Sequence, residues 1–287
     1  MHKVSQAHSA LRSYYTQLSR FAQGGIFLRI HLAITPAALA RLEQPPALPL
    51  AHIAYAIDEG GCLARARVPE MLRGGLLGLS DHCAAPLRRP EALCRAIVSE
   101  CRARGFHGVL ADFGSPCCPG RGALLEQLSH MLAAQGRTLY CPFALAPALA
   151  RALVGTAVSG GSLRVLLEEA ANRRGAQQLA LDLERVQMDF PLPCPSGSGT
   201  PLTHSELLAL RQRHPSSVYF SRELMANYFT YTDGGGTHFV LFDDAETLRQ
   251  KLVLAQRLGI GEAFVMYPET ADLLSALEDM QKEVHHD

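Results

Sequence analysis

Three carboxylates lie within or directly after short apolar runs, where they could transfer protons. Residues 105–114 read Gly-Phe-His-Gly-Val-Leu-Ala-Asp-Phe-Gly, the pattern of a buried strand that ends in a single carboxylate, Asp112. Asp182 and Glu184 alternate with leucines in a second run, so both side chains point to one side of a strand. Carboxyl groups in different environments can act as general acid and general base. The alternative for Asp182 and Glu184 is a structural ion pair with Arg or Lys.

A second group of side chains has the chemistry of zinc ligands. His82 with Cys83, Asp112 and the adjacent pair Cys117-Cys118 follow predicted strands, and imidazole and thiolate groups suit zinc. Adjacent cysteines rarely bind one metal ion together, however, and the spacing is irregular. We therefore expect no metal site.

Two glycine-rich segments do not support a cofactor, and we expect none. Arg73-Gly74-Gly75 lacks the Gly-Lys-Ser/Thr ending of a phosphate-binding loop. Residues 234–236 lack the strand-to-helix context of a dinucleotide fingerprint. The 8 cysteines include no C-x-x-C pair, so we expect reduced thiols.

Apolar runs of strand length alternate with helical patterns, which is typical of a parallel sheet. The expected helices are 90–104, 124–135 and 163–173. The expected strands are 27–34, 52–57, 75–79, 108–113, 138–143, 153–158, 178–184 and 263–267. Eight strands joined by crossover helices predict an α/β fold, a (β/α)8 TIM barrel, whose chemistry lies at the C-terminal ends of the strands. An open doubly wound sheet is the alternative.

The spacing changes between the seventh and eighth strands. Residues from about 190 to 243 are too many for one βα unit, and they contain short β runs at 217–220, 228–232 and 238–242. The last two runs flank Asp233-Gly234, which predicts a hairpin. We expect a small α+β insertion on the rim of the barrel.

The rest of the domain organisation is simple. Residues 1–24 have the spacing of an amphipathic helix and lack the apolar stretch of a secretory signal, so we expect a cytoplasmic protein as synthesised. Residues 25–287 form the expected barrel. The 27 Lys and Arg residues balance the 27 Asp and Glu residues, which argues against a nucleic-acid partner. No apolar run is long enough to indicate a membrane span.

Several segments together resemble glycoside hydrolase family 18, the chitinase-like enzymes. Residues 105–114 resemble the fourth-strand signature G-[FY]-D-G-x-[DN]-x-D-[FWY]-E. Residues 188–193 resemble the Y-D-W-x-L-P that follows strand seven in spore-cortex-lytic and LysM-associated bacterial members. Residues 228–252 resemble their F-x-Y…H-x-V-W-F-x-D segment, and residues 258–261 their G-L-x-G run. The similarity extends over roughly residues 25–270.

Each matched residue also has a structural explanation. Asp243 and Asp244 can cap the helix that begins near Ala245, because a side-chain oxygen accepts from an unpaired helical N–H. Lys251 is expected on the solvated face of that helix. His238 is expected to form a hydrogen bond in the hairpin.

The resemblance also implies a mechanism, and most of its parts are missing. In that family a Glu ending strand four protonates the leaving oxygen, and the Asp two residues earlier orients the acetamide of the substrate. Asp112 matches this Asp, but Gly114 occupies the position of the acid. The Trp of strand eight is replaced by Met266, and residues 153–161 offer only hydroxyls in place of the strand-six motif. Loss of general acid catalysis alone costs about 10²–10⁴-fold in rate.

The sequence therefore predicts a pseudoenzyme that binds an N-acetylglucosamine-type glycan or serves as a scaffold. Tyr55, Phe113, Met266 and Tyr267 are the candidate ligand-binding residues. One alternative is an active glycoside hydrolase whose acid has moved, to Glu184 or Asp182. The other is a structural protein associated with the spore. Self-association and a protein partner are left open.

Overall fold

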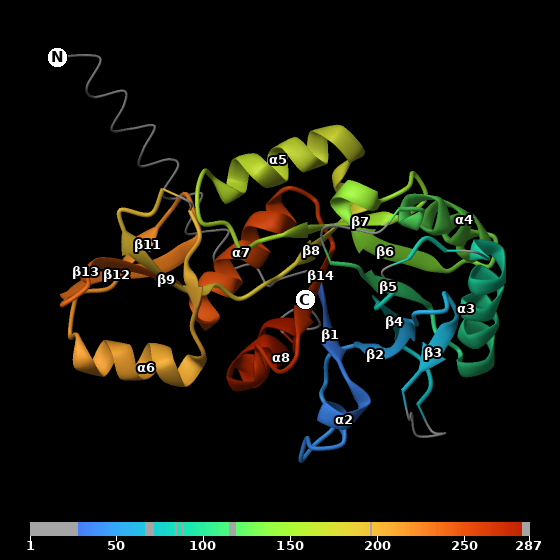
Figure 1. The fold of residues 1–287 in the computed structure, drawn as a ribbon, viewed down its shortest axis with the longest axis horizontal. Coiled ribbons are helices and arrows are strands. Elements are labelled where there is room, and N and C mark those ends of the chain that lie inside the picture. The colour runs from blue at the N-terminus through green and yellow to red at the C-terminus, as the bar shows by residue number, and fades with distance from the viewer. Residues whose placement is uncertain are drawn as a thin grey trace.

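The structure is a computed structural model that describes residues 28–66, 72–83, 85–87, 89–114, 119–195 and 197–282. Eight parallel strands close into a barrel, because β1 hydrogen-bonds to β14 on one side and to β2 on the other (Figure 1). The expected fold, a (β/α)8 barrel with an insertion between its seventh and eighth strands, is confirmed. The barrel strands are β1 (Arg29–Ile34), β2 (Leu50–Ile57), β4 (Leu76–Asp81), β5 (Gly108–Asp112), β6 (Thr138–Pro142), β7 (Arg151–Gly155), β8 (Leu179–Asp182) and β14 (Glu262–Met266).

Side chains fill the inside of the barrel. Leu110, Tyr140, Ala180 and Phe264 belong to one interior cluster, as expected for residues that alternate along each strand with outward-facing ones. His31 is buried among them and stacks on Phe264, with ring centroids 4.8 Å apart. Burial lowers the pKa of His31 to about 4, so the imidazole is neutral near pH 7. This packing leaves the two ends of the barrel as the places where a ligand can bind.

Helices cover the outside of the barrel in two groups (Figure 1). The first group packs over β2, β4, β5 and β6, and the second over β7, β8, β14 and β1, so the outer apolar residues form two separate clusters. The first group is α3 (Pro90–Arg104) and α4 (Arg121–Ala133), and the second is α5 (Leu163–Arg174), α7 (Ala245–Arg257) and α8 (Leu274–Lys282). The three helices expected from the sequence correspond to α3, α4 and α5.

Short elements connect some of the strands. The connection after β1 has a single helical turn, and that after β6 has only a 3₁₀ turn, so these crossovers lack the helix expected of a regular (β/α)8 barrel. The short elements are α2 (Pro36–Leu39), β3 (Leu63–Arg65), η1 (Phe143–Leu145), η2 (Ala176–Gln178) and η3 (Ala271–Leu273). None of the described helices is long and apolar enough to cross a membrane.

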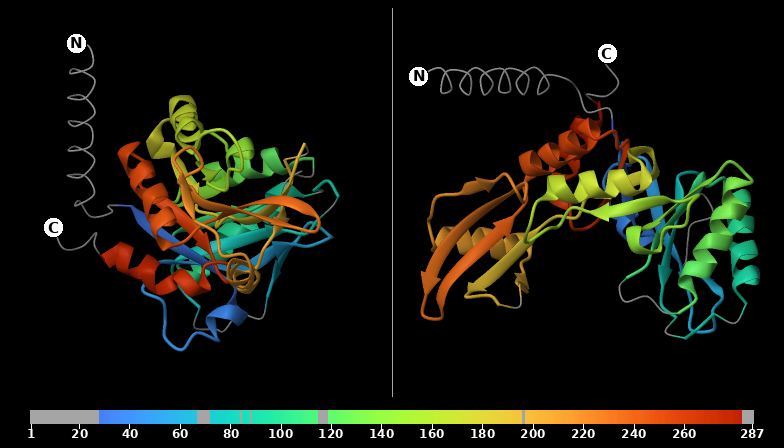
Figure 2. Two further views of the ribbon diagram at one scale, coloured as in Figure 1. Left: turned by 90° about the vertical axis from the view of Figure 1, so that its left-hand side faces the viewer. Right: turned by 90° about the horizontal axis from the view of Figure 1, so that it is seen from above.

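The insertion forms a second sheet beside the barrel (Figure 2). Five antiparallel strands lie in the order β10-β9-β13-β12-β11, and α6 (His204–Arg213) covers one face. The predicted hairpin is the β12–β13 pair, which turns at Asp233 and Gly236. The strands are β9 (Gln187–Leu192), β10 (Thr200–Pro201), β11 (Tyr219–Ser221), β12 (Ala226–Asp233) and β13 (Gly236–Phe242).

Helix α7 joins the inserted sheet to the barrel and corrects one expectation. Asp244 caps it, in a reciprocal pair of hydrogen bonds with Thr247. Lys251 is not solvated. Its side chain and that of Asp243 are both 0% exposed, and Nζ lies 2.7 Å from Asp243 Oδ2. Lys251 follows Thr247 by four residues, so it falls on the buried face of the helix. The helix expected at residues 1–24 lies outside the described residues.

Candidate functional site

Asp112 lies at the C-terminal end of the barrel. It is the last residue of β5 and shares the inward side of that strand with Leu110, yet its side chain is exposed at the mouth. Although Asp112 is exposed at the mouth, the surrounding protein partly removes its carboxyl from water, and this desolvation raises the pKa of Asp112. Gly114 follows two residues later, and a Cβ built on it would meet no atom within 4 Å. Among the described residues nothing fills the place of a side chain at this position, and glycine has no side chain to supply.

Three further carboxylates converge on the same end. Asp182 ends β8, Glu184 follows it, and Glu269 lies in the connection after β14. Burial, together with repulsion by Glu184, Asp112 and Glu269, raises the pKa of Asp182 to about 7. Burial also raises the pKa of Glu184 and of Glu269, and Asp112 and Glu184 add to the effect on Glu269. Four carboxyl groups from β5, β8 and the last loop therefore share one negative environment.

The structural ion pair considered for Asp182 and Glu184 does not form. Within the described part of the chain, no Arg or Lys side chain forms a salt bridge with any of the four carboxyl groups. Arg185, the nearest Arg in sequence, pairs with Asp272 instead. Burial first, and then the charges of the neighbouring carboxyl groups, therefore hold the pKa of Asp182 at about 7.

Gly155 makes room for Glu184. It ends β7 and lies opposite Asp182 in the β7–β8 register. A Cβ at this position would lie 2.8 Å from Glu184 Oε2, so a larger residue would push the carboxylate away. The backbone N–H of Ala157 donates to Glu184 and opposes the rise in its pKa. The orientation of Glu184 therefore depends on a glycine in the neighbouring strand.

A cavity of about 1040 Å³ opens between the barrel mouth and the inserted sheet. Glu184 and Glu269 line its barrel side, and Met188 and Phe190 line its sheet side. Residues 197–199 form part of the wall, where Gly199 lies against the Phe190 ring. The cavity thus has carboxylates on one side and apolar side chains on the other, as in many small-molecule sites.

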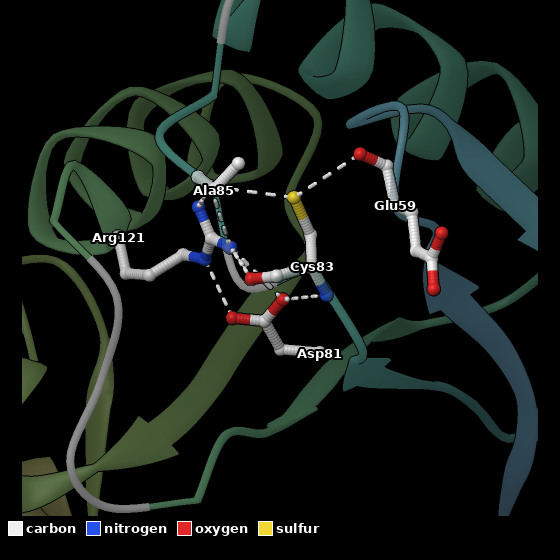
Figure 3. A network of polar contacts seen from close by, with 5 residues as sticks. All are labelled: Glu59, Asp81, Cys83, Ala85 and Arg121. Carbon is white, nitrogen blue, oxygen red and sulfur yellow. Dashed lines mark hydrogen bonds and ion pairs between the residues drawn. The ribbon is translucent and has the colours of Figure 1, made fainter.

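A buried arginine fixes the loop that follows β4 (Figure 3). Arg121, the first residue of α4, is 1% exposed and donates from two nitrogens to Asp81. It also donates to the backbone oxygens of Cys83 and Ala85. The Cys83 thiol donates to Ala85 O at 3.3 Å. This network connects the start of α4 with the end of β4 and the residues that follow it.

The structure changes the expectation for two of the four candidate ligand-binding residues. Tyr55 does not line the mouth. A bulge between Ile53 and Tyr55 shifts the register of β2, so the ring points outward and its hydroxyl donates to Glu100 at 2.9 Å. Phe113 is also outward-facing, 5% exposed in the outer core, because it follows the inward-facing Asp112.

The other two candidates lie nearer the mouth. Met266 packs against the interior cluster, and Tyr267 is half-buried against the outer one. Neither lines the 1040 Å³ cavity. Their part in ligand binding stays a prediction.

The histidine and cysteine residues do not assemble into a metal site among the described residues. His82 is exposed and Cys83 is committed to the Arg121 network. Cys117 and Cys118 lie outside the described residues. Elsewhere, His238 forms its expected hydrogen bond, from Nδ1 to Asp189 Oδ1 at 3.0 Å, and Tyr231 donates to Asp189 Oδ2 at 2.8 Å.

Glu269 and Gly155 were not identified from the sequence. Glu269 comes shortly after the eighth strand, and any acid in that position reaches the C-terminal mouth of a barrel. The position of Glu269 after the eighth strand could therefore have identified it as a candidate site residue. The contact between Gly155 and Glu184 depends on strand register, which the sequence alone does not give.

Comparisons with known proteins place this geometry in a class. No family model matches the chain, and no curated protein matches it. The spore cortex-lytic enzyme SleL of Bacillus cereus is 15% identical, with 90% of this chain and 74% of that chain covered and a TM-score of 0.65. A chitinase of Chromobacterium violaceum is 15% identical over 91% of this chain and 99% of that chain, with a TM-score of 0.64.

A class V chitinase of Nicotiana tobaccum, a mutant in complex with NAG4, is 11% identical over 88% of this chain and 98% of that chain, with a TM-score of 0.63. At these identities the likeness shows the fold. This chain has the barrel fold seen in chitinases and spore cortex-lytic enzymes, and the resemblance found in the sequence is confirmed at that level.

Proposed function

We propose that this protein binds a glycan at the C-terminal mouth of the barrel and is not a glycosidase of the chitinase type. The observation that carries the proposal is Gly114, which supplies no carboxylic acid two residues after Asp112 at the C-terminal end of β5. The family mechanism needs a proton at that position. The missing Trp and the missing strand-six motif remove two further parts of the family mechanism, whereas Asp112 is present.

The cavity of about 1040 Å³ supports binding. Its volume is that of a large ligand site, and its apolar wall at Met188 and Phe190 suits the apolar faces of sugar rings. Glu184 and Glu269 can accept hydrogen bonds from sugar hydroxyls. A solved neighbour of the same fold binds NAG4, which makes an N-acetylglucosamine oligomer the first ligand to test.

Calorimetric titration of the full chain with the N-acetylglucosamine tetramer tests this proposal. We expect saturable binding that Glu184→Gln and Glu269→Gln each weaken several-fold, since each removes a charged acceptor. Glu126→Gln, an exposed change on α4, is the matched control. We expect no release of chromophore from aryl N-acetylglucosaminides. Turnover that disappears in Asp112→Ala would end this proposal.

A second function is favoured by one observation, the pKa of Asp182 at about 7. A carboxylic acid that keeps its proton near neutral pH, beside ionised carboxylates, is the arrangement that glycosidases use. Here protonated Asp182 would donate to the glycosidic oxygen as the C–O bond breaks, and ionised Asp112 would stabilise the positive charge on the sugar. Water would then add to the sugar carbon and return a proton to Asp182.

This alternative predicts a particular pH dependence of turnover. Turnover of an aryl glycoside should fall on the alkaline side with a pKa near 7 and should be lost in Asp182→Asn. Turnover that survives Asp182→Asn would eliminate it.

The spore-associated structural role stays a prediction. Light scattering of the purified chain with and without an oxidant tests it, because Cys62 is exposed. A monomer under both conditions would count against this role.

A further inference from the structure

A second cavity, of about 580 Å³, opens at the opposite end of the barrel. It lies over the N-terminal ends of four neighbouring strands, β1, β2, β4 and β5. Arg29 begins β1, Arg73 precedes β4, His107 precedes β5, and His52 lies near the start of β2. These four cationic or titratable side chains face one space, although they are far apart in sequence.

Among the described residues, no acidic side chain lines this cavity. Arg29 and Arg73 are both exposed, and neither forms a salt bridge with a carboxylate of the described residues. Two acids near this end of the barrel are already paired. Glu262, opposite Arg29 in the β1–β14 register, binds Arg151 at 2.8 Å, and Glu100 binds Arg104 at 2.7 Å. The two guanidinium groups therefore keep their charge available for a ligand.

The backbone brings these groups together through two glycines. Gly74 and Gly75 have φ values of +73° and +70°, which side chains rarely adopt. A Cβ on Gly75 would lie 2.3 Å from Leu50 O, so this strand end can approach β2 only as glycine. His52, beside this contact, is 5% exposed, and its Nδ1 has no hydrogen-bond partner among the described residues. The cavity is thus shaped by closely packed backbone.

We propose that this cavity binds a small molecule that carries a phosphate monoester. Arginine suits phosphate because its planar guanidinium can donate two parallel hydrogen bonds to two oxygens. The volume is larger than one phosphate needs, and Leu39, Pro49 and Leu72 supply an apolar wall for an organic portion. The site is independent of glycan binding, since it lies at the other end of the barrel.

Titration calorimetry of the full chain with glucose 6-phosphate and with inorganic phosphate tests the proposal, at one ionic strength set by sodium chloride. Glucose is the uncharged control. We expect glucose 6-phosphate to bind more tightly than inorganic phosphate, and glucose not to bind. Arg29→Gln and Arg73→Gln should each weaken glucose 6-phosphate binding by about tenfold, the loss of one charge-assisted contact.

Arg102→Gln is the matched control. Arg102 is exposed at the end of α3, donates to the Gln135 side chain and does not line the cavity. Arg102→Gln removes one positive charge, as the other two substitutions do, and should leave the affinity for glucose 6-phosphate unchanged. Equal weakening by Arg102→Gln would mean a diffuse basic surface and overturn the site. Failure of both anions to give saturable binding would overturn it as well, and so would equal affinity for the two.

Discussion

Asp182 is a carboxyl group that folding makes harder to ionise. Burial and three neighbouring carboxylates oppose its negative charge, and no cation among the described residues compensates. Such a group costs stability whenever it ionises. Its retention at the mouth of a barrel is typical of a functional site, where perturbed pKa values cluster.

Asp182→Asn is predicted to raise stability at alkaline pH. With a folded pKa of about 7, against the ordinary 3.8, the folded state holds a proton that the unfolded state has lost. Stability contributed by this proton is full at low pH and is lost as pH rises toward 7. The full loss, between about pH 4 and pH 7, amounts to roughly 4 kcal/mol, at about 1.4 kcal/mol per pKa unit.

Urea unfolding at about pH 5 and about pH 8 measures this effect, since the wild-type difference should shrink in Asp182→Asn. Asp279→Asn, an exposed change on α8, serves as the control and should leave the pH dependence as it is. If Asp182→Asn showed the same difference in stability between the two pH values as the wild type, the raised pKa could not belong to Asp182.

The sequence predicted some of these residues and not others, for identifiable reasons. Asp112 and Asp182 were found because a carboxylate at the end of an apolar run is visible in the sequence. The outward direction of Phe113 follows from strand alternation beside Asp112 and could have been predicted. The direction of Tyr55 could not, because a one-residue bulge in β2 reverses it and leaves no sequence signal.

At the level of elements, α7 is tied to the rest of the molecule by a buried ion pair. Asp243 Oδ2 accepts from both Lys251 Nζ and the backbone N–H of Val186, and Oδ1 accepts from Thr247. Val186 precedes β9, so one carboxylate connects the helix with the start of the inserted sheet. The family resemblance included this segment. The spacing of four residues between Thr247 and Lys251 places both on one face of the helix, and it could have shown that Lys251 is buried.

Lys251→Met is predicted to destabilise the protein by about 3–5 kcal/mol, because it leaves Asp243 buried without its cation. Chemical denaturation provides the measurement. Lys282→Met removes an exposed lysine and should leave the stability essentially unchanged. Equal effects of the two substitutions would show that the buried pair has no special importance.

The whole molecule contains apolar clusters that are separate from one another. The inserted sheet has its own, in which Leu207, Phe229 and Val240 pack between α6 and the strands. The barrel is stabilised by its interior cluster and by two outer ones. Regions with separate cores can open separately.

Native-state hydrogen exchange is predicted to show this separation. Phe229→Ala should cost about 3–5 kcal/mol locally and lower the protection of the β12–β13 amides while sparing β1 and β14. Leu181→Ala, in an outer barrel cluster, should lower the protection of the barrel strands instead. An equal loss of protection in all strands after Phe229→Ala would mean that the molecule opens as one unit.

The overall fold was largely readable from the sequence, because eight apolar runs of strand length that alternate with helical patterns predict a barrel with few alternatives. The missing helices after β1 and β6 were not predicted. A crossover helix is the usual connection between parallel strands, and only the packing shows where a short loop suffices.

The helix-poor connections after β1 and after β6 have a mechanical consequence. They divide the barrel into half-shells, each of four adjacent strands with its own outer apolar cluster, joined at β6–β7 and at β1–β2. Cleavage of the chain between residues 146 and 150 would therefore break the connection between β6 and β7 without cutting a helix. We expect the nicked fragments to remain associated, held by backbone pairing at both seams, and to separate only under denaturing conditions.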